Sequence, residues 1–357
     1  MRIGKREIGA GHVYIVAELS GNHNQSFDLA VETVKAAATT GADAIKLQTY
    51  TADTITLNVS RSEFMARSDG PWAGQSLYSL YQKAHTPWEW HGPLQSIARE
   101  CGLDFFSSPF DSSAVELLAG LDVPAYKIAS FEVTDIPLID YVARQGKPVI
   151  ISTGIADESD IRLALDTCYQ AGNREVILLK CTSEYPASPE DANLNTMTIL
   201  RERFGVPVGL SDHSPGSVVP VVSVGLGAVL IEKHLMLDRS LGVIDSAFSL
   251  DVNEFREMVD AVRLAESTLG VGTLELTPEM KKSRASARSL YVTQDVRKGD
   301  EITPRNLRSV RPGHGLHTKY YGALLGKHFA SDVSAGTAMS MDLVEEDVPK
   351  SSPCGDE

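Results

Sequence analysis

The chain has 357 residues, 43% of them hydrophobic and 22% charged, which is typical of a globular protein. Its formal net charge of −14 disfavours non-specific binding to nucleic acid. We find no apolar run of about 18 residues that could span a bilayer and no N-terminal pattern of a secretory signal. The cysteines lack paired spacing, so we expect neither disulfides nor a cysteine zinc site. Together these features predict a cytoplasmic protein without nucleic-acid or membrane partners.

Eight short apolar or β-branched runs recur along the chain, and each is followed by a polar loop and a segment with helical periodicity. Strands that are almost continuously apolar and alternate with helices indicate a parallel sheet covered by helices. Eight such units predict a closed α/β fold, the (β/α)8 or TIM barrel. The predicted strands are residues 14–19, 44–49, 104–109, 125–130, 148–153, 176–182, 207–214 and 229–235.

The connection between the second and third predicted strands, residues 50–90, is unusually long and rich in aromatic residues. Loops of this length in a compact domain are usually functional or disordered, and the aromatic content argues against disorder. We call this segment the 50–90 excursion. It is expected to carry part of the functional site.

The barrel is expected to span residues 1–272, because a helical pattern ending in glycine closes it. A barrel of about 250 residues leaves a remainder for a second, smaller domain. Polar, basic residues 273–288 predict a linker, and short strands with glycine turns predict a compact domain over 289–348. Residues 349–357 are expected to form a disordered tail.

Polar residues follow the predicted strands at their carboxyl ends, which is the face where TIM barrels carry their active sites. A single serine at such a place is often only a helix N-cap. Several hydroxyls beside two lysines instead favour a shared anion site, since both groups donate hydrogen bonds to phosphate, although the lysines could form structural ion pairs. The residues in question are Glu18, Lys46, Gln48, Ser108, Lys127, Ser130, Ser152, Thr182, Ser183, Ser211, His213 and His234.

His213 and His234 end neighbouring strands and could bind one divalent ion with open coordination positions, or could simply be hydrogen-bonded histidines. Glu18 and Glu132 are the best placed carboxylates for proton transfer, with a salt bridge to a nearby lysine as the alternative for each. Asp245 could contact a sugar hydroxyl or cap a turn.

Taken in order, a set of short motifs resembles the sialic acid synthase family, which joins a synthase barrel to an antifreeze-like (SAF) domain. The motifs cover all of the chain except its tail. Within the family, the segment LYSLYQKAHTPWEWH most resembles pseudaminic acid synthases, in contrast to N-acetylneuraminate or legionaminate synthases. The motifs are AELSGNHN, IKLQ, SSPFD, YKIAS, STG, CTSEYP, LSDHS, EKH and VRPGHG.

The resemblance implies a metal-dependent condensation of phosphoenolpyruvate with an acetamido sugar. It implies that His213 and His234 bind a divalent ion, usually manganese, and that a domain-swapped homodimer forms. The acceptor sugar would lie near Tyr185 and Asp245, with Arg311 reaching its acetamido group from the partner subunit. Phosphoenolpyruvate would be held by Lys46, Ser108, Lys127, Ser130, Ser152, Ser183 and Ser211, where Ser183 replaces an asparagine of some members.

Two other classes of function remain open from the sequence. A Schiff-base aldolase would use Lys127 and pyruvate without a metal, and the paired histidines argue against it. A non-enzymatic ice- or carbohydrate-binding protein would leave the polar rim of the barrel unexplained.

Overall fold

The computed structural model describes residues 1–9, 11–68, 70 and 72–346, in two compact units. The first unit is Met1–Gly270 and the second begins at Val271. The expected tail, residues 349–357, lies outside the described residues.

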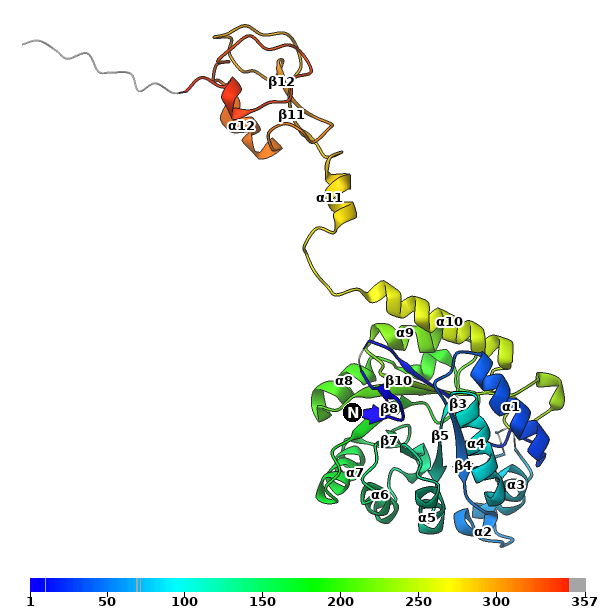
Figure 1. Cartoon of the computed structure of the whole chain (residues 1–357). Coiled ribbons are helices and arrows are strands. Elements are labelled where there is room, and N and C mark those ends of the chain that lie inside the picture. Colours follow the sequence, from blue (N-terminus) through cyan, green and yellow to red (C-terminus); the bar gives the residue numbers. More distant parts are fainter. Residues whose placement is uncertain (10, 69, 71, 347–357) are drawn as a thin grey trace, which may run out of the picture. The chain divides into compact units, whose positions relative to one another are not determined.

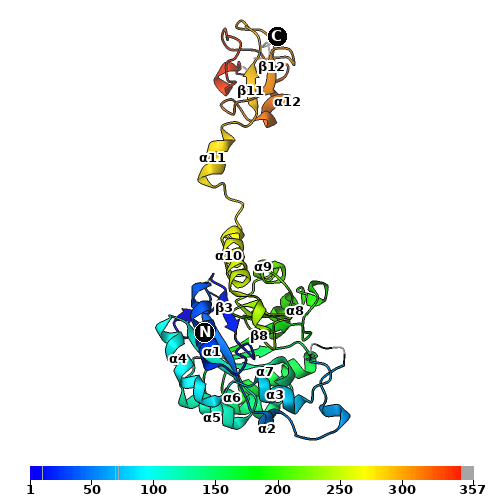
Figure 2. The same ribbon diagram turned by 90° about the vertical axis from the view of Figure 1, so that its right-hand side faces the viewer.

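The first unit contains a closed barrel of eight parallel strands, which confirms the predicted TIM barrel. The strands follow one another around the barrel in chain order, and β10 closes it by pairing with β3. Figure 1 shows the helices around the outside of the strands, and the turned view in Figure 2 agrees. The strands are β3 (Tyr14–Glu18), β4 (Ala44–Thr49), β5 (Asp104–Pro109), β6 (Tyr126–Ile128), β7 (Val149–Ser152), β8 (Val176–Cys181), β9 (Val208–Asp212) and β10 (Leu230–His234).

The helices that cover the strands bury one apolar face each against the barrel. In α10, for example, Phe255, Met258, Val259 and Val262 are buried at helical spacing, and Asp251 caps the first turn. These helices are α1 (Phe27–Thr39), α4 (His91–Glu100), α5 (Ser112–Gly120), α6 (Ile136–Ala143), α7 (Glu158–Gln170), α8 (Thr196–Phe204), α9 (Val218–Gly225) and α10 (Val252–Leu269).

The 50–90 excursion is structured. It holds α2 (Ala52–Ile55), α3 (Leu77–Ala84) and two short 3-10 helices, Ser62–Phe64 and Trp88–Trp90. The side chain of Ser76 accepts a hydrogen bond from the backbone N–H of Ser79 and so caps α3. Further 3-10 turns in the first unit are Ser130–Glu132, Pro189–Ala192 and Arg239–Leu241.

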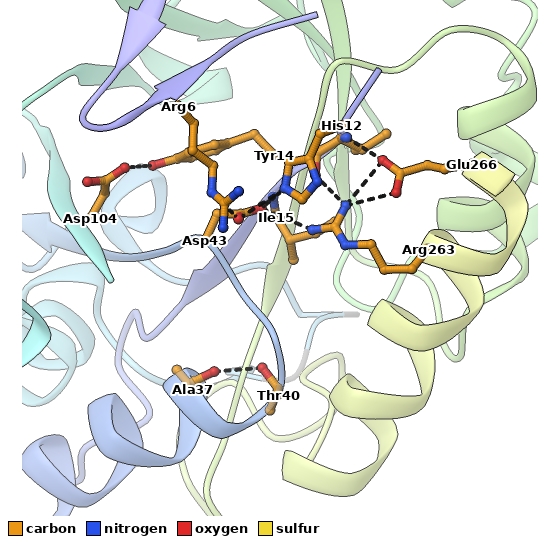
Figure 3. Close-up of polar contacts among 11 residues, drawn as sticks. Arg6, His12, Tyr14, Ile15, Ala37, Thr40, Asp43, Asp104, Arg263 and Glu266 are labelled. Atoms are coloured by element: carbon orange, nitrogen blue, oxygen red, sulfur yellow. Dashed lines mark hydrogen bonds and ion pairs between the residues drawn. The ribbon is translucent and has the colours of Figure 1, made fainter. Parts of the chain in front are cut away.

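A cluster of charged side chains lies where the barrel strands begin, around the buried carboxylate of Asp43 (Figure 3). Arg6, from the short hairpin of β1 (Arg2–Ile3) and β2 (Arg6–Glu7), lies 2.5 Å from Asp43. His12 and Arg263 each lie 3.1 Å from the same carboxylate, and the backbone N–H of Ile15 donates to it at 2.8 Å. Since Arg263 belongs to α10, this cluster ties the first and last parts of the unit together. Polar residues at this end of a TIM barrel serve stability.

The second unit has its own small hydrophobic core, which includes Leu290, Val292, Ile302 and Phe329. Its strands β11 (Ser289–Val292) and β12 (Leu307–Val310) pair antiparallel. It also holds α12 (Tyr321–Leu324) and the 3-10 turns Thr318–Tyr320 and Met341–Leu343.

The segment expected to be a linker contains the short helix α11 (Pro278–Arg284). Thr277 caps it, proline stands in its first turn and basic residues stand in its last turn, all of which favour a helix. Among the described residues, no helix combines the length and hydrophobicity that crossing a membrane requires.

Candidate active site

The carboxyl ends of the barrel strands surround a cavity of about 740 Å³. It receives side chains from β3, β4 and β6 to β10 and from the loops that follow them. The position agrees with the active-site face of TIM barrels. The predicted site residues that line it are Glu18, Lys46, Gln48, Lys127, Ser130, Glu132, Ser152, Ser183, Tyr185, Ser211, His213, His234 and Asp245.

Three residues selected from the sequence do not line this cavity. Ser108 is fully buried behind the wall, where its hydroxyl accepts a hydrogen bond from Lys46 Nζ at 3.1 Å. Its contact is therefore with the lysine that lines the cavity. The backbone carbonyl of Thr182 hydrogen-bonds Nδ1 of His213. Arg311 belongs to the second unit, at the residue after β12.

Lys46 is buried between two carboxylates. Its Nζ lies 2.8 Å from Glu18 Oε2 and 3.5 Å from Glu232 Oε1. Although burial lowers the pKa of Lys46, these two carboxylates outweigh it and hold the pKa above its usual value, so Lys46 is charged. The side-chain amide of Gln48 donates a hydrogen bond to Glu18 Oε1 at 3.0 Å.

Lys127 Nζ donates to Ser152 Oγ at 2.7 Å and lies 4.0 Å from Glu232 Oε1. Burial lowers the pKa of Lys127, while Glu232 opposes that shift. Glu232 therefore stands between both lysines. It was not selected from the sequence, although it precedes His234 by two residues and so faces the same side of its strand.

The hydroxyls of Ser130 and Ser183 meet at one wall of the cavity, where Ser183 Oγ donates to Ser130 Oγ at 2.8 Å. They can approach because Gly154 has no side chain. A Cβ at Gly154 would lie 2.2 Å from Ser183 Oγ and 2.8 Å from Ser130 Oγ. The glycine of the STG motif thus leaves room for two hydrogen-bonding groups.

Glu18 and Glu132 both have strongly raised pKa values. Burial raises the pKa of each to about 7, against the lowering effect of Lys46 on Glu18 and of Lys127 on Glu132. The Oε2 atoms of both are buried without a hydrogen-bond partner, but Glu18 Oε2 lies 2.8 Å from Lys46 Nζ and Glu18 Oε1 accepts a hydrogen bond from Gln48. Glu132 is therefore the carboxylate more available for proton transfer.

His213 and His234 face each other, with ring centroids 5.3 Å apart. His213 Nδ1 hydrogen-bonds the carbonyl of Thr182 at 2.9 Å, and the ring also hydrogen-bonds the Cys181 side chain. Although burial lowers the pKa of His213, these contacts outweigh it and hold the pKa above its usual value. His234 Nδ1 is buried without a hydrogen-bond partner and lies 3.7 Å from Asp245 Oδ2. Burial, followed by the charge of His213, lowers the pKa of His234 well below its usual value, so this imidazole is neutral.

An imidazole binds a divalent ion in its neutral form, which burial favours at His234, whereas at His213 a metal would replace the proton that Cys181 favours. No group of three or more His, Cys, Asp or Glu residues gathers as potential metal ligands in the part of the chain that the structure describes. A metal here would thus have two protein ligands and open positions for substrate and water.

The loop after β10 is fixed by Asn22, a fully buried residue that was not selected from the sequence. Its side-chain amide donates to the carbonyl of Leu235 at 2.9 Å and to Ser249 Oγ at 2.8 Å. Its amide oxygen accepts from the backbone N–H of Asp245 at 3.2 Å. Asn22 thereby holds both ends of the loop that carries Asp245.

An aromatic cluster covers the side of the cavity next to the histidines. Tyr185 and Phe248 pack at 5.0 Å between ring centroids, and Trp72 from the 50–90 excursion contacts both, at 6.1 and 6.2 Å. Trp72 and Phe248 were not selected from the sequence, because nothing in a loop's composition shows which of its residues turn inward.

Comparisons with known proteins show which family the chain belongs to. The sequence model of the NeuB family matches residues 33–273, and that of the SAF domain matches residues 287–345. The chain is 48% identical to a pseudaminic acid synthase of Campylobacter jejuni over 92% of this chain and 95% of that protein. It is 46% identical to a pseudaminic acid synthase of Helicobacter pylori over 93% of this chain and 97% of that protein.

A solved N-acetylneuraminic acid synthetase from Leptospira borgpetersenii, crystallised with citrate, is 30% identical and superimposes with a TM-score of 0.70. That alignment covers 79% of this chain and 94% of the other. The two family models, over residues 33–273 and 287–345, and relatives that align along nearly the whole chain identify the protein as a member of the NeuB family with a C-terminal SAF domain.

Proposed function

We propose that this chain is a pseudaminic acid synthase. It condenses phosphoenolpyruvate with 2,4-diacetamido-2,4,6-trideoxy-L-altrose and water, and it releases pseudaminic acid and phosphate. The observation that carries the proposal is one cavity with two lysines and several hydroxyls on one part of its wall and two facing histidines on another. The relatives with this name, at 46% and 48% identity, support the choice of sugar.

Phosphoenolpyruvate binds to the lysines and hydroxyls. Lys46 and Lys127 neutralise its negative charges, while Ser130, Ser183 and Ser211 donate hydrogen bonds to its oxygens. Ser152 and Ser108 position the two lysines through the hydrogen bonds described above. Glu232 keeps the lysines in place before the anion arrives, since it lies within 4.0 Å of both.

His213 and His234 hold the divalent ion, which we propose to be manganese. When bound there, the ion supplies Lewis-acid activation of the sugar aldehyde. Asp245 and Tyr185 contact the sugar from the adjoining wall, because both line the cavity beside the histidines. The phosphoenolpyruvate and the aldehyde are thus held together, and this proximity lowers the barrier to reaction.

The reaction forms a bond between C3 of phosphoenolpyruvate and the aldehyde carbon, whose oxygen takes up a proton. Positive charge that develops at C2 is quenched by water, and Glu132 accepts the water's proton. The new hydroxyl on the tetrahedral C2 then passes its proton to the departing phosphate as the C2 carbonyl forms, and the proton accepted by Glu132 balances the one taken up by the aldehyde oxygen. Glu132 suits this role because its Oε2 has no other partner and its pKa is about 7, close to a working pH. Glu18 holds Lys46 and assists from the adjoining strand.

We further propose that the enzyme works as a dimeric assembly. The enzyme forms a domain-swapped homodimer in which Arg311 of one chain reaches the acetamido group of the sugar bound by the other. It belongs to the EC 2.5.1 type of transferase and works in the cytoplasm. Size-exclusion chromatography with light scattering tests the dimer, and loss of sugar affinity in Arg311→Ala tests the arginine.

The experiment that tests the function is phosphate release from phosphoenolpyruvate with a panel of sugars, with manganese and with chelator, and with products identified by mass spectrometry. Turnover only with the altrose sugar and metal is the expected result. Turnover with N-acetylmannosamine or with the diacetamido mannose analogue would assign an N-acetylneuraminate or legionaminate synthase. Trapping of a lysine adduct by borohydride, without metal dependence, would assign a Schiff-base aldolase.

A further inference from the structure

We infer that Trp72 is a specificity-determining residue that contacts the C6 methyl group of the acceptor sugar and disfavours sugars with a hydroxyl there. This inference rests on the proposed function and names the part of the cavity that recognises the deoxygenated end of the substrate.

The cavity has two chemically different walls. Its floor, at the strand ends, carries the charged and hydroxyl groups described above. The part supplied by the 50–90 excursion also contains Tyr50, Arg67 and Tyr81, but most of its lining is apolar and includes Ile55, Trp72, Leu77 and Leu80. We call these four residues the apolar wall. An apolar wall beside a charged floor favours a ligand that is polar at one end and hydrophobic at the other.

Ring contacts run from the two histidines through Phe248 to Trp72, and they indicate how the sugar lies in the cavity. Phe248 lies 4.9 Å from His234 and 5.9 Å from His213 between ring centroids, and Trp72 lies beyond Phe248 at 6.2 Å. In the proposed reaction the aldehyde carbon C1 is held at the histidines. The opposite end of the open-chain sugar, C6, therefore extends toward Trp72 and the apolar wall.

Trp72 is held in a fixed orientation. Its indole N–H donates to the carbonyl of Ile244 at 3.1 Å, and its ring packs against Tyr185 and Phe248. The only hydrogen-bonding group of the indole is thus already used, so the ring presents only apolar surface to a ligand. A methyl group gains contact with that surface, whereas a hydroxyl would lose its hydrogen bonds to water there.

Hydrophobic pockets discriminate against an added hydroxyl by about 100-fold. The test compares the altrose sugar with 2,4-diacetamido-2,4-dideoxy-L-altrose, which differs from it only by a hydroxyl on C6. For each enzyme variant, the selectivity is the ratio of kcat/KM for the 6-deoxy sugar to kcat/KM for the 6-hydroxy sugar.

The variants are Trp72→Ala, Trp72→Gln and Trp72→Phe, with Leu57→Ala as the matched control. Leu57 belongs to the same excursion but is 60% exposed and does not line the cavity. We expect the selectivity to fall about tenfold in Trp72→Ala and Trp72→Gln, because the hydroxyl regains access to water or a polar partner. It should stay within about twofold of wild type in Trp72→Phe and Leu57→Ala.

Equal losses of kcat/KM for both sugars, with an unchanged ratio, would overturn the inference and leave Trp72 a purely structural residue. If Trp72→Ala does not fold, Trp72→Gln and Trp72→Phe make the same comparison. Failure of the wild-type enzyme to turn over either sugar would instead refute the proposed function, and the inference with it.

Discussion

Replacing Glu132 by glutamine should lower activity by about 100-fold or more and, at alkaline pH, stabilise the fold. Burial raises the pKa of Glu132 from 4.5 to about 7 in the folded chain. Between these values the folded state binds more protons than the unfolded state, so stability falls as the pH rises through this window. The full shift corresponds to about 3 kcal/mol of stability lost by pH 8. The glutamine side chain cannot ionise, so the variant avoids this loss.

The assay is thermal unfolding of wild type and Glu132→Gln at pH 5 and pH 8, in chelator so that metal binding does not contribute. We expect similar Tm values at pH 5 and a variant that melts about 4–8 °C higher at pH 8. Phosphate release at pH 8 should fall by about 100-fold or more, as for loss of a general base. Glu190→Gln, at an exposed position, is the matched control and should change neither quantity.

The same difference in Tm between variant and wild type at pH 5 and at pH 8 would refute the reasoning about burial. Stabilisation at pH 8 with retained turnover would refute only the catalytic role, and Glu18 would then be the residue to examine.

Three further predictions concern positions away from direct proton transfer. In Gly154→Ala the new Cβ displaces the hydroxyl of Ser183, so KM for phosphoenolpyruvate should rise about tenfold, as measured by steady-state kinetics, with little change in Tm. Asn22→Ala removes three buried hydrogen bonds at the loop that carries Asp245, and should lower stability by about 2–3 kcal/mol and raise KM for the sugar more than KM for phosphoenolpyruvate. Equal changes in both KM values would contradict that role. Asp43→Asn leaves two arginines without their buried carboxylate and should cost about 3 kcal/mol in denaturant unfolding, while kcat at 25 °C stays at the wild-type value.

The sequence predicts the barrel well because its signals are local and repeated. Each strand is a short apolar run, and a barrel of parallel strands brings all their carboxyl ends to one face. Most polar residues selected on that basis do line one cavity. The predicted strands are correct in number and order, and differ from the observed ones mainly by one or two residues at their ends.

The alternation of side chains along a strand could have refined the site further. Residues two apart face the same side, which links Lys46 with Gln48 and Glu232 with His234. Glu232 was therefore within reach of sequence reasoning. The same holds for α11, whose capping threonine and first-turn proline are helix-start signals inside the segment expected to be a linker.

Other features depend on contacts between distant parts of the chain and left no local signal. The carboxylate of Asp43 gathers residues 6, 12 and 263, whose proximity follows only from closure of the barrel. Trp72 turns into the cavity because of the path of the 50–90 excursion, which has no periodicity to show it. Ser108 lies near the end of a strand as expected, but it does not line the cavity and instead hydrogen-bonds Lys46 in the protein interior.

The two ends of the barrel treat buried charge in opposite ways. Around Asp43, two arginines, a histidine and a backbone N–H satisfy one carboxylate. In the cavity, Glu18 Oε2, Glu132 Oε2, Glu232 Oε2 and His234 Nδ1 are buried without hydrogen-bond partners. Unsatisfied buried polar atoms lower the stability of a fold by about 1–3 kcal/mol each. The cavity therefore destabilises the barrel, and the satisfied cluster around Asp43 offsets part of that loss. Substrates and metal that supply the missing partners recover that energy as binding, which explains why the polar atoms without partners gather at the face where the chemistry is proposed.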